Sequence, residues 1–116
     1  MSNNRDLEER TEKFAAAVRA FCRAIKKDEL VIDDVKQLLR ASGSVGANCI
    51  EANEGLSAKD TLMRFGICRK EVKESGYWIR ILKPTVSGAQ LETLRKLHNE
   101  TEELRRIFSS IITKLK

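Results

Sequence analysis

The hydrophobic positions along the chain recur at steps of three and four residues almost throughout, which predicts helices and no strands. In the first segment these positions are Leu7, Thr11, Phe14, Val18, Phe21 and Ile25. They form one seam along one side of a helix, with charged residues outside it. We therefore expect a first helix over residues 6–27 and a second over 33–54, which Asp33 or Asp34 can cap at its start.

Polar breaks mark the end of the second helix and the start of the third. Gly55 is the residue type that commonly ends a helix in the left-handed conformation. Ser57, with Asp60 three residues further on, resembles a capping box. We expect a third helix over residues 58–83, because Pro84 cannot continue it.

The last segment repeats the seam of the first. Its recurring positions are Leu91, Leu94, His98, Thr101, Leu104, Phe108, Ile111 and Leu115. This pattern predicts a fourth helix over residues 88–115, with Ser87 as its cap. Short connections between helices of this length favour antiparallel neighbours. The sequence thus predicts an all-α fold, an antiparallel up-down-up-down four-helix bundle in which residues 1–116 form a single domain.

The middle of the second helix consists largely of residues with small side chains. It contains Ala41, Ser42, Gly43, Ser44, Gly46 and Ala47. A glycine inside a helix costs about 1 kcal/mol relative to alanine, so two of them require a compensating gain. We predict that another helix or a ligand packs closely on Ser42, Gly43, Gly46 and Ala47.

The third helix has two apolar faces. Phe65, Cys68, Val72, Ser75, Gly76 and Ile79 form the face that a bundle core would use. Met63, Ile67, Trp78 and Ile81 form a second face on another side. An isolated bundle needs only one apolar stripe per helix, so the second face predicts an interface with another subunit. The alternative is a wide core face with scattered exposed side chains.

A basic row lies beside the second apolar face. It consists of Arg69, Lys70, Lys73, Tyr77 and Arg80. Such a row can follow the phosphates of a single strand while its tyrosine stacks on a base. A solvated charged face with no ligand is the competing interpretation.

Composition and charge agree with a small globular protein. The chain has 116 residues, a formal net charge of +5 and 34% charged residues. Residues 58–86 alone contain seven basic and three acidic residues, which favours an anionic partner. The apolar runs are short and the N-terminus is polar, so we expect a cytoplasmic protein without a membrane partner.

Candidate catalytic and metal chemistry is sparse. Cys22, Cys49 and Cys68 are widely spaced and lie on apolar helix faces, which is typical of small buried thiols. His98 is the single histidine, so neither a zinc nor a di-iron site is expected. We predict no enzymatic activity and no cofactor.

Four glutamates offer one remote alternative. Glu51 with Glu54, and Glu71 with Glu74, project in pairs from the second and third helices. Facing pairs could hold Mg²⁺ for nucleotide hydrolysis. Pairing with nearby basic residues such as Arg40 is the competing interpretation, and we expect no metal site.

Residues 40–48, Arg-Ala-Ser-Gly-Ser-Val-Gly-Ala-Asn, and the following Ile50-Glu51-Ala52 resemble a known motif. It is the central motif of the bacterial four-helix bundle proteins named after the 23S rRNA intervening sequence, also called the S23 ribosomal protein family. Residues 6–11, 70–75 and 77–82 resemble the first and third helices of that family.

The resemblance implies an antiparallel bundle that assembles into a ring, a homopentamer in characterised relatives, without enzymatic activity. It also implies nucleic-acid binding through basic surfaces. A more distant relative, the accessory protein of diversity-generating retroelements, is a basic pentamer that partners a reverse transcriptase. We therefore expect a homo-oligomer that binds RNA or DNA. The alternative is a scaffold for a partner protein with no role in nucleic-acid binding.

Overall fold

The computed structural model describes residues 2–116. Its elements are α1 (Ser2–Ala24), α2 (Glu29–Glu54), α3 (Ala58–Ile81), a short 3-10 helix η1 (Lys83–Thr85) and α4 (Gly88–Leu115). This part of the chain contains no strand, so the predicted all-α class is confirmed. None of its helices combines the length and the hydropathy needed to cross a membrane.

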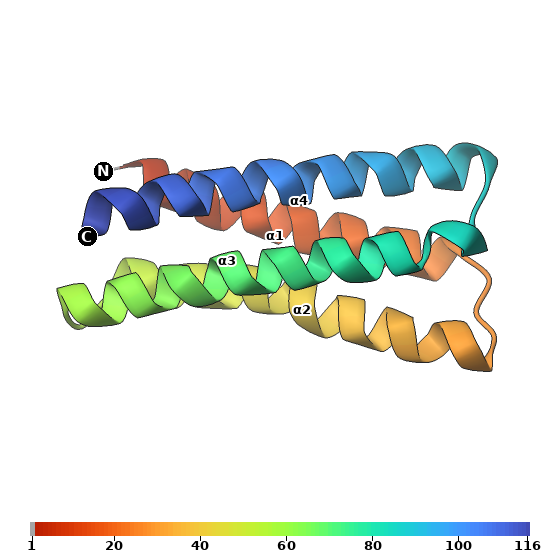
Figure 1. Cartoon of the computed structure of the whole chain (residues 1–116), viewed down its shortest axis with the longest axis horizontal. Coiled ribbons are helices and arrows are strands. Elements are labelled where there is room, and N and C mark those ends of the chain that lie inside the picture. The colour runs from red at the N-terminus through yellow and green to blue at the C-terminus, as the bar shows by residue number, and fades with distance from the viewer. Residues whose placement is uncertain (1) are drawn as a thin grey trace.

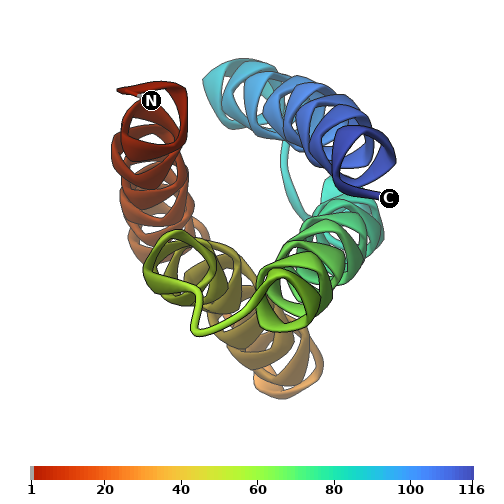
Figure 2. The same cartoon turned by 90° about the vertical axis from the view of Figure 1, so that its left-hand side faces the viewer.

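The four long helices lie side by side along the 44 Å axis of the molecule (Figure 1). The two termini lie at the same end of that axis. Viewed from this end, the helices surround a common interior in the order α1, α2, α3, α4 (Figure 2). The packing between α2 and α3 is the most extensive, and the packing between α1 and α4 is much sparser.

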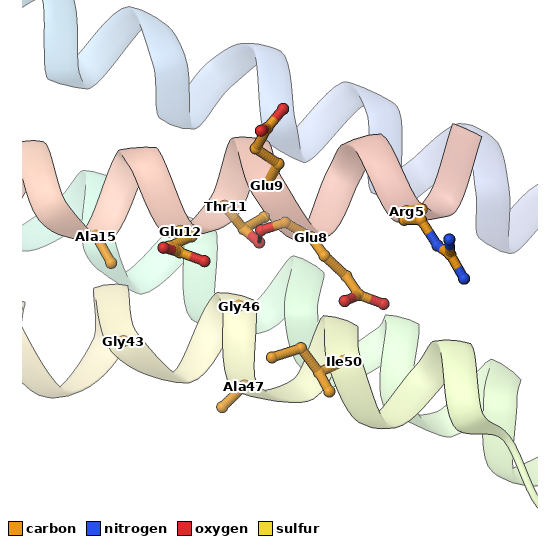
Figure 3. A pocket seen from close by; sticks show the side chains of 10 residues that line it. All are labelled: Arg5, Glu8, Glu9, Thr11, Glu12, Ala15, Gly43, Gly46, Ala47 and Ile50. Atoms are coloured by element: carbon orange, nitrogen blue, oxygen red, sulfur yellow. Dashed lines mark hydrogen bonds between the residues drawn. The ribbon is translucent and has the colours of Figure 1, made fainter. Parts of the chain in front are cut away.

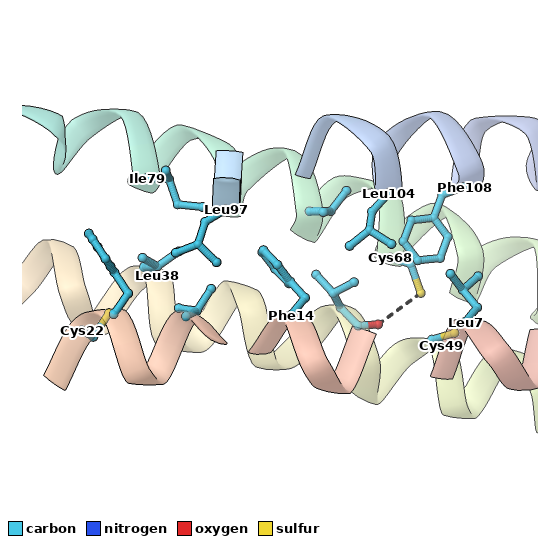
Figure 4. Close-up of a cluster of buried hydrophobic side chains, with 14 of the residues drawn as sticks. Leu7, Phe14, Cys22, Leu38, Cys49, Cys68, Ile79, Leu97, Leu104 and Phe108 are labelled. Atoms are coloured by element: carbon cyan, nitrogen blue, oxygen red, sulfur yellow. Dashed lines mark hydrogen bonds between the residues drawn. The ribbon is translucent and has the colours of Figure 1, made fainter. Parts of the chain in front are cut away.

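The core contains most of the seam residues that the sequence predicts, but the seam of α4 differs in part. Leu97 and Ile112 are buried there, whereas the predicted Leu115 is 46% exposed. Five of the six residues of the first predicted seam lie in α1 and Ile25 directly follows it, and all six are buried. The polar Thr11 is tolerated because its hydroxyl donates to Leu7 O at 2.9 Å. Phe65 of α3 and Phe108 of α4 meet in the interior with ring centroids 6.2 Å apart. Figure 4 shows these apolar side chains converging from all four helices.

The connection between α1 and α2 differs from the prediction. α1 ends at Ala24, three residues before the predicted end. Lys27, which follows the helix, donates from Nζ to Cys22 O at 2.7 Å and to Ile25 O at 2.8 Å. The cap of α2 is Asp28, whose carboxylate accepts from Val31 N at 2.9 Å. The predicted caps Asp33 and Asp34 are therefore wrong, because an earlier aspartate already satisfies the free amides.

The connection between α2 and α3 confirms one predicted cap and corrects another. Ser57 Oγ accepts from Asp60 N at 3.0 Å and caps α3 as predicted. Gly55 follows α2 with φ −9° and ψ 117°, which is not the left-handed conformation that we predicted. A glycine is still required there, since a Cβ atom would collide with the Thr61 hydroxyl.

The start of α4 also differs from the prediction. Ser87 occupies the cap position, but its side chain makes no capping hydrogen bond. The tight turn is made by Gly88, whose φ of +57° is left-handed. Pro84 lies within η1, so α3 ends at Ile81, two residues before the predicted end.

One charged cluster joins α1 to α4 across their sparsely packed side. Arg10 Nη2 lies 2.8 Å from both Glu100 Oε1 and Glu103 Oε1. Hydrogen bonding to the Arg10 guanidinium lowers the pKa of Glu103 below its ordinary value of 4.5. Because the pKa of Glu103 is lower in the folded state, this pairing stabilises the fold fully above the ordinary pKa, and the stabilisation is lost as the pH falls through the lowered, folded-state pKa.

We therefore expect Arg10→Gln to destabilise the protein at pH 7 and to have a smaller effect at pH 3. Urea unfolding of the mutant and the parent at both pH values measures the difference. Lys13→Gln is the matched control, since Lys13 is exposed on the same helix and should show no such pH dependence. An equal destabilisation by Arg10→Gln at both pH values would contradict the ionic account.

Candidate nucleic-acid interface

The predicted basic row follows one exposed side of α3. Arg69, Lys70, Lys73 and Tyr77 line a shallow hollow of about 400 Å³, together with Gly66 and Glu74. A Cβ atom at Gly66 would have no neighbour within 4 Å, so that end of the hollow is open. Arg80 lines an adjacent hollow with His98 of α4. The structure thus places four of the five predicted residues around one concave surface.

These cations differ in how firmly they are held. Arg69 Nη1 donates to Ser109 Oγ at 3.4 Å, and Arg80 Nη1 lies 3.1 Å from His98 Nε2, so both contact α4. Lys70 Nζ lies 4.0 Å from Glu71 Oε2, which is a weak ion pair. Lys73 is exposed and has no ion pair within residues 2–116. The two lysines are therefore the cations most available to a phosphate.

Tyr77 is the aromatic group of the hollow. Its side chain is 47% exposed, and its ring packs edge-on against Trp78 with centroids 4.9 Å apart. Trp78 in turn packs against the hydrophobic core. Contact with Trp78 thus holds the tyrosine ring on the core of the subunit, and its exposed part offers a surface on which a base can stack.

Two of the acidic residues of α3, Glu71 and Glu74, contact α2. Arg40 of α2 pairs with Glu71 at 3.6 Å and with Glu74 at 3.2 Å. Glu71 is 6% exposed. This pairing compensates the charge of Glu74, which lines the same hollow as the lysines.

The same contacts bear on the magnesium hypothesis. Glu71 and Glu74 are paired with an arginine, whereas Glu51 and Glu54 are exposed on α2. Among the described residues, no group of three or more His, Cys, Asp or Glu side chains is placed to hold a metal ion. The structure does not bring the four glutamates into one site.

The second apolar face of α3 is only partly exposed. Met63 and Ile81 are 51% and 41% exposed. Ile67 and Trp78 are half-buried, and Trp78 contributes to the core of its own subunit. The surface available to another subunit is therefore centred on Met63, Ile67 and Ile81.

The small-residue stretch of α2 lies against α1. A Cβ atom at Gly46 would lie 3.2 Å from Thr11 Oγ1, and one at Gly43 would lie 3.1 Å from Arg19 Nη2. Ser42 is buried, and its hydroxyl donates to Leu39 O at 3.3 Å. Ala47 is exposed, so the prediction of close packing is wrong for Ala47 within the subunit, because α1 does not cover it.

Sequence reasoning missed one basic residue near the hollow. Arg105 is four residues from Thr101 and four from Ser109, and these two face Gly76 and Arg69 of α3. Arg105 therefore lies on the α3 side of α4. Its Nη2 lies 3.1 Å from Glu102 Oε1, and this hydrogen bond lowers the pKa of Glu102. No sequence signal identifies which side of α4 meets α3.

The three cysteines are free and buried, as predicted. Burial raises the pKa of Cys22. Hydrogen bonding with Cys49, together with burial, raises the pKa of Cys68, whose Sγ donates to Val45 O at 3.5 Å. Cys22 and Cys68 are thus held as protonated packing groups rather than as nucleophiles.

These features define an all-α protein of four helices with a basic hollow on its third helix. The chain belongs to the family of the 23S rRNA-intervening sequence protein, whose model matches residues 4–110. The description of that family names no enzymatic activity. The resemblance found in the sequence is therefore confirmed.

One solved structure is similar over nearly the whole chain. It is the crystal structure of a protein of unknown function from the S23 ribosomal protein family of Bacteroides thetaiotaomicron VPI-5482. The two share 27% sequence identity and superpose with a TM-score of 0.76, covering 90% of this chain and 96% of the other. Among curated proteins, none matches the chain.

Proposed function

We propose that this protein is a non-enzymatic cytoplasmic subunit of a ring-shaped homo-oligomer, a pentamer of antiparallel four-helix bundles, that binds single-stranded nucleic acid. The observation that carries the proposal is the hollow on α3. It presents Lys70 and Lys73 beside the half-exposed Tyr77, while Arg40 neutralises the glutamates of the same helix.

Each group has a distinct role in this proposal. Lys70 and Lys73 bind phosphates and release counterions, and Arg69 and Arg80 extend the positive surface towards α4. Tyr77 stacks on a base without selecting its identity. Binding of this kind is independent of sequence.

Assembly strengthens the effect of each hollow. Met63 and Ile81 leave an apolar surface that the subunit itself does not cover. Copies joined through this surface repeat a +5 charge around the ring. A strand that contacts several hollows is then held by avidity rather than by one site.

We expect Lys70→Gln combined with Lys73→Gln to weaken binding of a labelled single strand and to flatten its salt dependence. The slope of log K against log salt should fall by about 0.7 for each phosphate of the strand that the variant no longer neutralises. Fluorescence anisotropy with RNA and DNA oligonucleotides between roughly 50 and 200 mM salt measures both quantities.

The matched control is Lys13→Gln combined with Lys96→Gln, which removes two exposed charges from α1 and α4. An equal weakening in the control would assign the binding to net charge alone. A parent protein that does not change the anisotropy of any strand at low salt would contradict the proposal.

A protein partner is the second candidate. Leu56, in the connection between α2 and α3, is 95% exposed, and Leu30 near the start of α2 is 80% exposed. These apolar side chains are uncovered in the subunit, as in a scaffold for another protein. A stoichiometric protein that copurifies after nuclease treatment would favour the scaffold over nucleic-acid binding.

A further inference from the structure

A ring of more than two identical subunits requires two different faces on each subunit. We infer that the part of the α3 face formed by Met63 and Ile67 docks in the groove between α1 and α2 of the next copy. This inference rests on the proposed assembly and names the surface that receives the α3 face.

The groove has a small, partly apolar floor. Gly43, Ala47 and Ile50 line it from α2, and Glu8 and Glu12 line it from α1 (Figure 3). Its volume is about 530 Å³. Ala47 is exposed and Ile50 is 49% exposed, although the neighbouring Gly46 is covered by α1. Small side chains on this side of α2 leave room for the larger residues of an incoming helix.

The charges on the two faces are complementary. Three glutamates, Glu8, Glu9 and Glu12, outnumber the single Arg5 in the lining and give the groove an acidic rim. Glu12 is exposed and has no ion pair in the part of the chain that the structure describes. The α3 face is bordered by the exposed Lys59, on the same side of the helix as Met63, and the charge of its Glu74 is compensated by Arg40 of α2. Docking therefore brings a lysine towards an acidic groove, which favours this pairing over one between two copies of the α3 face.

The axial register also agrees. In a ring whose axis runs along the helices, equivalent residues of all copies lie at the same height. Within the subunit, Cys68 Sγ contacts Val45 O at 3.5 Å, and Arg64 Nη1 donates to Asn48 Oδ1 at 3.1 Å. The part of α3 around Ile67 is thus level with Ala47.

The neighbouring residues follow from that register. One turn towards the end that holds the termini, Met63 is level with Ile50. The ring would therefore place apolar side chains opposite apolar ones.

The two faces share α2 as their common border. Glu74 lies at nearly the same angle around α3 as Met63 and Ile81 and pairs with Arg40 of α2, so the α3 face adjoins α2 on one side. The groove adjoins α2 on its other side. The two faces meet at one helix and are therefore not on opposite sides of the subunit. Each contact then rotates the next subunit relative to the last, which favours a closed ring over a straight filament.

The test uses two variants that each block one face. Ala47→Glu blocks the groove and leaves the α3 face intact, whereas Met63→Glu blocks the α3 face and leaves the groove intact. Both positions are exposed, so neither substitution disturbs the core. Each variant alone should be a monomer of 13.2 kDa by light scattering. An equimolar mixture should form a heterodimer and stop there, because each remaining free face is blocked.

The outcomes separate the two proposals. A parent protein that is monomeric would overturn the assembly and this inference together. A parent that assembles, with a mixture that forms no heterodimer, would overturn the inference alone, as would either variant assembling like the parent. Ala16→Glu, at an exposed alanine of α1 outside the groove, is the control and should assemble normally.

Discussion

Replacing Phe108 by alanine should lower the free energy of unfolding by about 3–5 kcal/mol. Phe108 is fully buried, and its ring lies against Phe65, which is 1% exposed. The substitution removes a large apolar side chain and leaves a cavity that two rigid helices cannot close. Urea unfolding followed by circular dichroism, at one fixed protein concentration, measures the change.

The matched control is Ile111→Ala, because Ile111 lies three residues further along α4 and is only partly buried against the same core. Its destabilisation should be clearly smaller. The slope of the free energy against urea concentration should stay unchanged in both variants if only the folded state is affected. A destabilisation by Phe108→Ala no greater than that by Ile111→Ala would mean that α3 and α4 are not joined through this aromatic pair.

The helices could be predicted from the sequence because each carries a seam that one core buries. The five seam residues of α1 and the following Ile25 are all buried, since their spacing fixes which side faces inward. The start of α2 could not be predicted in the same way. Asp28, Asp33 and Asp34 all have side chains that can cap a helix, and the choice depends on where α1 ends.

The candidate interface could be predicted only in part. The spacing along α3 is enough to place Lys70, Lys73 and Tyr77 on one side of that helix. The contributions of α4 depend on which of its sides meets α3, and this is a property of packing rather than of local pattern. Arg105 was missed for this reason. The partial burial of Trp78 was missed likewise, because the sequence places it on a face but does not show how far the core extends.

Replacing Gly46 by leucine should destabilise the protein by about 1–3 kcal/mol, or more if α1 cannot move. The Cβ atom alone would lie 3.2 Å from Thr11 Oγ1 and 3.7 Å from the Thr11 carbonyl carbon. The hydroxyl cannot turn aside freely, because it bonds to Leu7 O and Glu8 O at 2.9 and 3.0 Å. The added side chain must therefore push α1 away from α2. Thermal unfolding, with the free-energy change obtained from the shift in Tm, measures the effect.

Gly66→Leu makes the same change where space is open, since a Cβ atom there would meet no neighbour within 4 Å. In a helix, leucine is favoured over glycine by roughly 0.5–1 kcal/mol, so this control should raise the stability. Gly46→Leu should lower the stability and Gly66→Leu should raise it. Since both make the same change of residue, the difference tests the packing around each glycine. If both leucines stabilise the protein, α1 does not approach the small-residue stretch closely. The groove between α1 and α2 would then lack the wall that holds Glu8 and Glu12 beside Ala47.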